Sequence, residues 1–280
     1  YMPVNSYGEH HWVSEFYMDW DKTENGWFEA KALVDGGWEN NINQVSSCSG
    51  DTGGNRPYDS GNHLARCGLV NVFDFNDGGC RIDKFPTNPQ RTAILLHYTS
   101  TPSQYMFMRG GIGNDRRPGC TRYEDTANLC SLTTELKSLG TGPHYNKYNA
   151  WMVGDSHLDW YGAESSQGQY YGQTAMGSPS VWTTDDNAHP GYQAVNKYGD
   201  AYWLLEFDID CYQTEGGWFE VKGFLSTNGV GIWEGDINQD STCSGTAGGS
   251  KPYASTNHMA RCGFVNVYEY NSDACRIDNF

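Results

Sequence analysis

Apolar residues along this chain occur in short runs of strand length, separated by polar, glycine-rich stretches. Residues 68–75 (GLVNVFDF) and 263–270 (GFVNVYEY) alternate apolar and polar positions, as half-buried strands do. Residues 92–100 and 104–112 predict two further strands around a Pro-Ser turn. The other predicted strands cover residues 12–16, 26–34, 202–207 and 217–225.

Helix is expected in few places. Residues 133–139 predict one short helix, and the segments NHLARCG and NHMARCG each predict a helical turn that ends at glycine. In NAWMVG, strand alternation puts Trp151 and Val153 on one face. Together these elements predict an all-β chain of antiparallel β-sandwich-like domains with little helix.

Two parts of the chain resemble each other. The segment VNSYGEHHWVSEFYMDWDKTENGWFEAK starts at Val4, and its counterpart VNKYGDAYWLLEFDIDCYQTEGGWFEVK starts at Val195, an offset of 191 residues. NHLARCGLVNVFDFNDGGCRIDKF ends at Phe85 and NHMARCGFVNVYEYNSDACRIDNF at Phe280, an offset of 195, because a loop of the second copy is four residues longer. This self-similarity predicts a tandem repeat of one fold.

The repeat divides the chain into a partial copy at residues 1–85, an unpaired β-domain at 86–191 and a second copy at 192–280. Two explanations stay open. A C-terminal subdomain is duplicated alone, or residues 86–280 form one full unit and the chain begins partway through a preceding one. The second explanation implies a longer array or a fragment.

Nine cysteines without a metal-type C-x-x-C pair predict disulfides and an oxidising compartment. Three first-copy cysteines align with three of the second copy, namely Cys48, Cys67 and Cys80 with Cys243, Cys262 and Cys275. The second copy has a further cysteine, Cys211, where the first has Trp20. The preferred pairing leaves Cys80 as a free thiol and joins Cys48–Cys67, Cys243–Cys262, Cys120–Cys130 and Cys211–Cys275. In the alternative, Cys211 takes another partner and a different first-copy cysteine is left over.

Charge and composition narrow the classes of partner. The formal net charge is −16, so phosphate backbones and anionic membranes repel the chain, and neither nucleic acid nor a membrane is an expected partner. No apolar run approaches the ~20 residues of a membrane span. With the cysteines, this predicts a secreted, extracellular protein, whose export signal has been removed or whose sequence from Tyr1 is a window on a longer chain.

Several long motifs resemble a known family. The runs TAILLHYTS, QYMFMRGGI, RRPGCT, HYNKYNAW, LDWYGAE, YGDAYWLLEFDIDC, GGWFEVKG and ARCGFVNV are similar to the accessory domain appended after the catalytic barrel of some invertebrate α-amylases. The resemblance covers residues 86–280 nearly end to end and residues 1–85 as a partial copy. It implies a non-catalytic domain that binds starch-type glucans or other carbohydrate.

Residues 149–185 combine aromatic rings with amide and carboxylate groups, which is the chemistry that holds a sugar face and its hydroxyls. In LDWYGAE, strand alternation places neighbouring rings on opposite faces, so one of them is expected to point outward, although a single ring is more often a core residue. The candidate carbohydrate-binding residues are Asn149, Trp151, Asp155, Trp160, Tyr161 and Trp182.

Catalytic chemistry is not expected. The nucleophile turn G-x-S-x-G is missing from the sequence, and none of the amylase barrel's catalytic motifs is present. The acids Asp155, Asp159 and Glu164 flank LDWYGAE, but their spacing alone does not position them as the opposed pair of a glycosidase. The chain is therefore predicted not to be an enzyme.

Calcium is the one candidate cofactor. Asp19 and Glu24 of the first copy match Asp210 and Glu215 of the second, beside glycine turns where oxygen ligands gather. The pattern departs from the EF-hand loop, so an ordinary acidic turn is the simpler interpretation.

Two functions follow from the sequence. The first is a non-catalytic extracellular carbohydrate-binding module for an α-glucan polysaccharide, whose weak sites gain from repetition. The alternative is a structural tandem-repeat protein that binds copies of itself and assembles into an extracellular matrix or filament.

Overall fold

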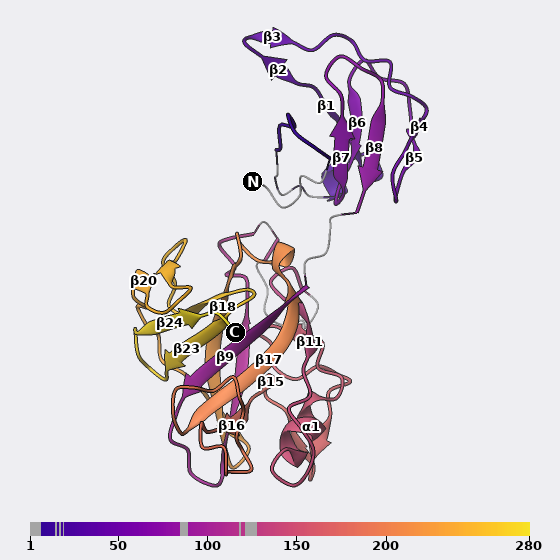
Figure 1. The fold of residues 1–280 in the computed structure, drawn as a ribbon. Helices are drawn as coiled ribbons and strands as arrows, with labels where there is room; N and C mark the ends of the chain where they lie inside the picture. Colours follow the sequence, from indigo (N-terminus) through magenta and orange to yellow (C-terminus); the bar gives the residue numbers. More distant parts are fainter. Residues whose placement is uncertain are drawn as a thin grey trace. The chain divides into compact units, whose positions relative to one another are not determined.

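The computed structural model of the chain describes residues 7–14, 16, 18, 20–84, 89–117, 119–120 and 128–280. Two compact units divide the chain: unit 1 is Tyr1–Pro86 and unit 2 is Thr87–Phe280 (Figure 1). Strands from residues 86–191 share their sheets with strands from 192–280, so these two segments are parts of one domain. No helix in the described part of the chain is long and apolar enough to cross a membrane.

The larger sheet of unit 2 is centred on β9 (Pro89–His97). This strand lies between β17 (Tyr202–Asp210), which is antiparallel to it, and β23 (Val265–Glu269), which is parallel (Figure 1). All residues at positions 92–96 are buried, because both faces of the sheet are covered, and this explains why residues 93–96 (AILL) are continuously apolar. The sheet is completed by β11 (Leu132–Leu136), β12 (His157–Leu158), β16 (Val181–Thr183) and β24 (Cys275–Asp278).

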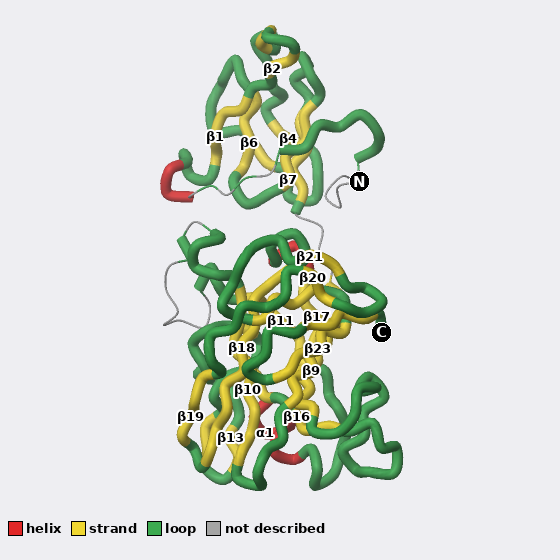
Figure 2. Tube along the Cα trace, turned by 90° about the vertical axis from the view of Figure 1, so that its left-hand side faces the viewer, coloured by secondary structure: helices red, strands yellow, loops and turns green. Residues whose placement is uncertain are grey.

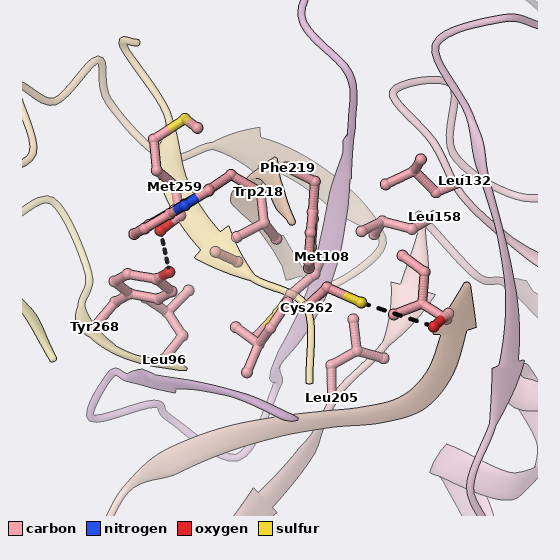
Figure 3. Packing of buried hydrophobic residues seen from close by; sticks show 14 of the residues in the cluster. Leu96, Met108, Leu132, Leu158, Leu205, Trp218, Phe219, Met259, Cys262 and Tyr268 are labelled. Atoms are coloured by element: carbon pink, nitrogen blue, oxygen red, sulfur yellow. Dashed lines mark hydrogen bonds between the residues drawn. The ribbon is translucent and has the colours of Figure 1, made fainter. Parts of the chain in front are cut away.

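The second sheet of unit 2 is built around β10 (Gln104–Gly111) and β18 (Trp218–Thr227). Figure 2 shows this sheet beside the larger one. Leu96 and Leu205 of the larger sheet share one buried cluster with Met108, Phe219 and Met259 of the smaller one (Figure 3). Unit 2 is therefore an all-β, sandwich-like domain. Its second sheet contains β10 (Gln104–Gly111), β15 (Ser178–Pro179), β18 (Trp218–Thr227), β19 (Val230–Trp233) and β22 (His258–Arg261).

Short elements complete unit 2. They are the helix α1 (Asn146–Met152), the hairpin of β13 (Gln169–Tyr170) and β14 (Gln173–Thr174), the 3-10 helix Cys211–Gln213, and the pair β20 (Thr242–Cys243) and β21 (Gly249–Ser250).

Unit 1 consists, in its described residues, of four two-stranded sheets and a 3-10 helix at Trp20–Lys22. A small buried cluster of Trp27, Leu64 and Ile82 packs around one disulfide. The strand pairs are β1 (Trp27–Ala30) with β6 (His63–Arg66), β2 (Leu33–Val34) with β3 (Gly37–Trp38), β4 (Ser47–Cys48) with β5 (Gly54–Asn55), and β7 (Val70–Phe73) with β8 (Cys80–Asp83).

Three local predictions are wrong. Residues 133–139 contribute to strand β11, because pairing with β17 outweighs a weak helical propensity. NHLARCG and NHMARCG form β6 and β22, whose backbone pairs with β1 and β18. NAWMVG lies largely in α1, where Tyr148 and Trp151 are buried at helical spacing.

A buried histidine–glutamate pair occurs at matching positions of the two units. His63 Nε2 lies 3.0 Å from Glu39 Oε1, and His258 Nε2 lies 3.0 Å from Glu234 Oε1. Burial raises the pKa of Glu234, but hydrogen bonds from the histidine and from backbone N–H groups outweigh it and hold the pKa below its usual value.

The C-terminal strands of the two units also carry the same contacts. Asp278 accepts hydrogen bonds from Arg276 Nε at 2.5 Å and from the Tyr198 hydroxyl at 2.8 Å, and Asp83 accepts from an arginine and a tyrosine at the same distances. Burial alone raises the pKa of each aspartate, but these bonds outweigh it and lower the pKa of both to about 2.

The disulfides correct the predicted pairing. Cys120 bonds to Cys130 as expected, but Cys48–Cys67, Cys211–Cys275 and Cys243–Cys262 are wrong, and Cys80 is not a free thiol. The alternative in which Cys211 takes another partner holds, and the unpaired cysteine is Cys67. The tertiary structure explains this pairing. Ser244, beside β20, forms a parallel bridge with Arg276 of β24, which brings Cys243 to Cys275. Cys262, directly after β22, contacts Ile209 near the end of β17 and so lies beside Cys211. The observed bonds are Cys48–Cys80, Cys120–Cys130, Cys211–Cys262 and Cys243–Cys275.

Candidate functional site

Three of the predicted carbohydrate-binding residues lie in the interior of unit 2. Trp151 is 3% exposed and packs edge-on against Phe107, with ring centroids 5.1 Å apart. Trp160 is buried, and its Nε1 donates a hydrogen bond to the carbonyl of Ile112 at 3.2 Å. Asp155 is buried as well. These side chains contribute to the core and offer no ring face to a sugar.

The other three predicted residues do not join into one surface. Tyr161 is about half exposed, so of the two neighbouring rings in LDWYGAE it is the one that points outward. Trp182 is partly buried between His144 and His189. Asn149 donates from Nδ2 to a backbone carbonyl at 3.1 Å. Among the described residues of unit 2, the most exposed ring is Tyr171, at the turn of the β13–β14 hairpin; it belongs to the aromatic segment 149–185 but not to the six candidate residues.

The acids around LDWYGAE face protein and not solvent. Burial, followed by the neighbouring Glu164, raises the pKa of Asp155 well above its usual value. Burial also raises the pKa of Asp159, to about 6. Burial likewise raises the pKa of Glu164, but hydrogen bonds from Ser156 and His157 outweigh it and hold that pKa below its usual range. These acids therefore interact with neighbouring protein groups and do not form an opposed pair open to a substrate.

The candidate calcium ligands that the structure describes take part in turns and an ion pair. Asp19 lies outside the described residues. Asp210 Oδ1 caps the 3-10 helix by accepting from the Tyr212 N–H at 3.0 Å, and Glu215 Oε1 lies 3.1 Å from Arg117 Nη2. Glu24 pairs through its backbone with the start of β1. No group of three or more acids, histidines or cysteines in the described part of the chain is placed to hold a metal ion.

The most unusual surface of the protein is an uncovered stretch of unit 1. Trp12 is 100% exposed, whereas Trp203, its counterpart in β17, is 5% exposed. Phe16 is 57% exposed, whereas its counterpart Phe207 is 0% exposed. The sequence predicts a strand at residues 12–16, but residues 12–14 and 16 belong to none, because in unit 2 the matching strand is held by β9, β11 and β16.

The strand β7 of unit 1 shows the same difference. Its counterpart β23 pairs with β24 on one edge and with β9 on the other, and its first four residues are buried. In the described structure β7 pairs with β8 alone, and all four of its residues are partly exposed. Asn266 Nδ2 donates to the carbonyl of Ala93 in β9 at 3.2 Å, whereas its counterpart Asn71 donates to carbonyls of unit 1 only.

A hollow of about 390 Å³ lies along β1, lined by Glu29, Ala30, Lys31, Trp38 and Asn62. The counterparts of the first three are Glu220, Val221 and Lys222 of β18, where Gly111, Gly110 and Arg109 of β10 are paired. Independently of the hollow, the described part of β1 pairs with β6 alone, so the β1 edge that matches the β10-paired edge of β18 carries no strand.

These three regions match the strands that contact β9 and β10 in unit 2, and we call them together the open face of unit 1, the candidate functional site. It comprises residues 12–14, 16 and 18, strand β7, and the hollow along β1. The repeat already contains the signal for it, since residues 1–85 match a segment whose neighbours in unit 2 come from residues 86–191, and nothing described in unit 1 replaces them.

No protein-family model, no curated protein and no solved structure matches this chain.

Proposed function

We propose that this chain is a non-catalytic structural protein that associates with further copies of its own repeat in an extracellular assembly. The observation that carries the proposal is the open face of unit 1, where rings that are buried in unit 2 are exposed. Monomeric proteins rarely expose large contiguous apolar surfaces, and such surfaces commonly mark protein–protein contacts.

The edges of the open face add a second kind of support. Strand β7 and the edge of β1 present backbone N–H and C=O groups that are paired in the matching strands of unit 2. Exposed strand edges recruit further strands. Four disulfides suit the oxidising conditions outside cells, where such an assembly would have to persist.

Self-association tests the proposal. Sedimentation velocity over a concentration series, with electron microscopy of the concentrated sample, is expected to show species larger than the 31.3 kDa chain. Phe16→Asp should reduce them, because it places a charge on the open face, and Tyr171→Asp should not, because it changes an equally accessible ring elsewhere. A strictly monomeric chain at every concentration would contradict the structural role.

Carbohydrate binding is the second candidate, and one observation favours it. Tyr171 is 91% exposed, and its ring centroid lies 4.5 Å from that of Tyr170, so the hairpin presents an aromatic ring to solvent. An α-glucan is the ligand that the resemblance to amylase accessory domains implies. Retention on insoluble starch, compared with chitin and cellulose, is expected to fall in Tyr171→Ala and to be unchanged in Trp12→Ala.

A further inference from the structure

The central strand β9 shows what the open face of unit 1 lacks. In unit 2, β9 pairs with nine residues of β17 and with five of β23, and so joins these strands into one sheet. Unit 1 contains the counterparts of both partners, in residues 12–18 and in β7, but its described residues contain no strand between them. A single strand inserted between these two segments could pair with both of them.

The residues that pair with β9 in unit 2 can be matched one by one with residues of unit 1. In β23, Val265 is opposite Ala93 and Val267 is opposite Leu95, and the counterparts in β7 are both valines. In β17, Trp203 is opposite Leu96, and its counterpart Trp12 is the most exposed ring among the described residues of unit 1. The two buried rings of β17 that lie opposite β9, Trp203 and Phe207, are thus kept in unit 1 as Trp12 and Phe16, whereas other positions differ, such as Ser14 in place of Leu205.

The edge of β1 that is not paired with β6 offers a place for the next strand. In unit 2, β10 follows β9 in the chain and pairs with β18 from Glu220 to Thr227. Two glycines of β10 lie opposite Glu220 and Val221, where the hollow of unit 1 is lined by Glu29 and Ala30. A β9–β10 segment would therefore cover both the apolar surface and the β1 edge.

Charge favours the same occupant. Residues 89–111 contain two arginines and no acidic residue, whereas residues 1–86 contain thirteen acidic and six basic residues. An association of these two sequences is therefore electrostatically attractive.

We propose that the open face of unit 1 is a strand-acceptor site, and that its occupant is the β9–β10 segment of another repeat unit, which inserts parallel to β7 and antiparallel to residues 12–18. The mode is β-strand addition, in which main-chain hydrogen bonds give affinity and the alternate side chains give register. This inference deepens the proposed structural role and rests on it, because it names the surface and the partner of the association.

The test uses the full chain and a synthetic peptide with the sequence of residues 89–111. Hydrogen exchange followed by mass spectrometry is expected to show that the peptide protects residues 12–18 and β7. The matching residues of β17 and β23 are the internal control and should not change, since they already pair with β9. A peptide with Leu95→Pro should protect neither region, because proline removes the N–H that an interior strand donates.

Two variants of the chain sharpen the test. Trp12→Ala is expected to weaken the peptide's affinity about tenfold or more, as loss of a buried aromatic anchor does, without unfolding unit 1, because this ring is fully exposed in the free chain. Tyr171→Ala is the matched control and should bind the peptide unchanged. The thiol of Cys67, which lies 3.8 Å from the carbonyl of Met18, should be alkylated more slowly in the complex.

The outcomes separate the two proposals. If the chain self-associates but the peptide gives no more protection than its Leu95→Pro form, the strand-acceptor site is refuted and the structural role stands. If the peptide protects residues 12–18 and β7 while the chain alone stays monomeric, the surface accepts a strand, but self-association is refuted, and with it the proposal that another copy of the chain supplies that strand. Protection of unit 2 in place of unit 1 would also overturn the acceptor site.

Discussion

The pair Trp12 and Trp203 offers a direct measure of how differently the two units use the same sequence. Each tryptophan is replaced by alanine in a separate variant. Trp203 is 5% exposed in the core of unit 2, and its Nε1 donates to the carbonyl of Tyr98 at 3.2 Å. Trp12 is 100% exposed.

The magnitudes follow from these environments. Replacing a buried aromatic residue by alanine removes its transfer free energy and leaves a cavity, which together cost about 3–5 kcal/mol. Leaving the Tyr98 carbonyl without its donor adds about 1 kcal/mol. Trp203→Ala should therefore lower the free energy of unfolding of unit 2 by about 4–6 kcal/mol. Trp12→Ala should change that of unit 1 by less than about 0.5 kcal/mol, as exposed substitutions do.

Urea denaturation read by hydrogen exchange and mass spectrometry reports each unit separately, with peptides from β1 for unit 1 and from β18 for unit 2. Dilute protein keeps any self-association from adding to the stability of unit 1. The pair Phe16→Ala and Phe207→Ala repeats the comparison, since Phe207 is fully buried and Phe16 is not. A loss of several kcal/mol from unit 1 in Trp12→Ala would refute the reasoning, because it would mean that residues 12–16 pack as a strand in the isolated chain.

Three further predictions concern the covalent and ionic contacts. Alkylation of the unfolded, non-reduced chain should label one cysteine, Cys67, and two labelled sites would contradict the pairing. Trp20→Cys should form a disulfide with Cys67, as the matching cysteines of unit 2 do, and should stabilise unit 1 by about 2–4 kcal/mol in denaturation experiments. Because the folded-state pKa of Asp278 is lowered to about 2, its contribution is present above pH ~4 and is lost as the pH falls towards 2. Asp278→Asn should therefore lower the free energy of unfolding of unit 2 by about 2 kcal/mol at pH 7, with the difference disappearing near pH 2 in acid-denaturation curves.

Much of the fold could be predicted from local patterns. The alternation in GFVNVYEY and the apolar run AILL indicate β23 and β9, because burial of one or both faces dictates those patterns directly. Local secondary-structure propensity gave the wrong prediction where pairing with another strand determined the secondary structure. Residues 132–136 have no strong strand signal and become β11 because β17 offers an edge.

The predicted binding site failed for a related reason. Tryptophans and acids that are close together in sequence provide the groups that a sugar-binding site needs. Their sequence does not show which way each side chain points. Trp151 and Trp160 are core residues because α1 and the loop after β12 pack against the smaller sheet. Tyr171 lies in the aromatic segment 149–185 but could not be singled out, because its exposure depends on a two-residue hairpin turn with positive backbone φ, which composition does not reveal.

The sequence by itself determined the β-rich class, the likeness of residues 1–85 to 192–280 and the number of cysteines. Only the tertiary structure decided which cysteines pair and which copy is complete. Both outcomes depend on contacts between residues far apart in the chain: Cys211 meets Cys262 across a separation of 51 residues, and β9 meets β23 across more than 160. Nearly the same residues are therefore buried in unit 2 and exposed in unit 1, because a strand is stable only where another strand lies beside it.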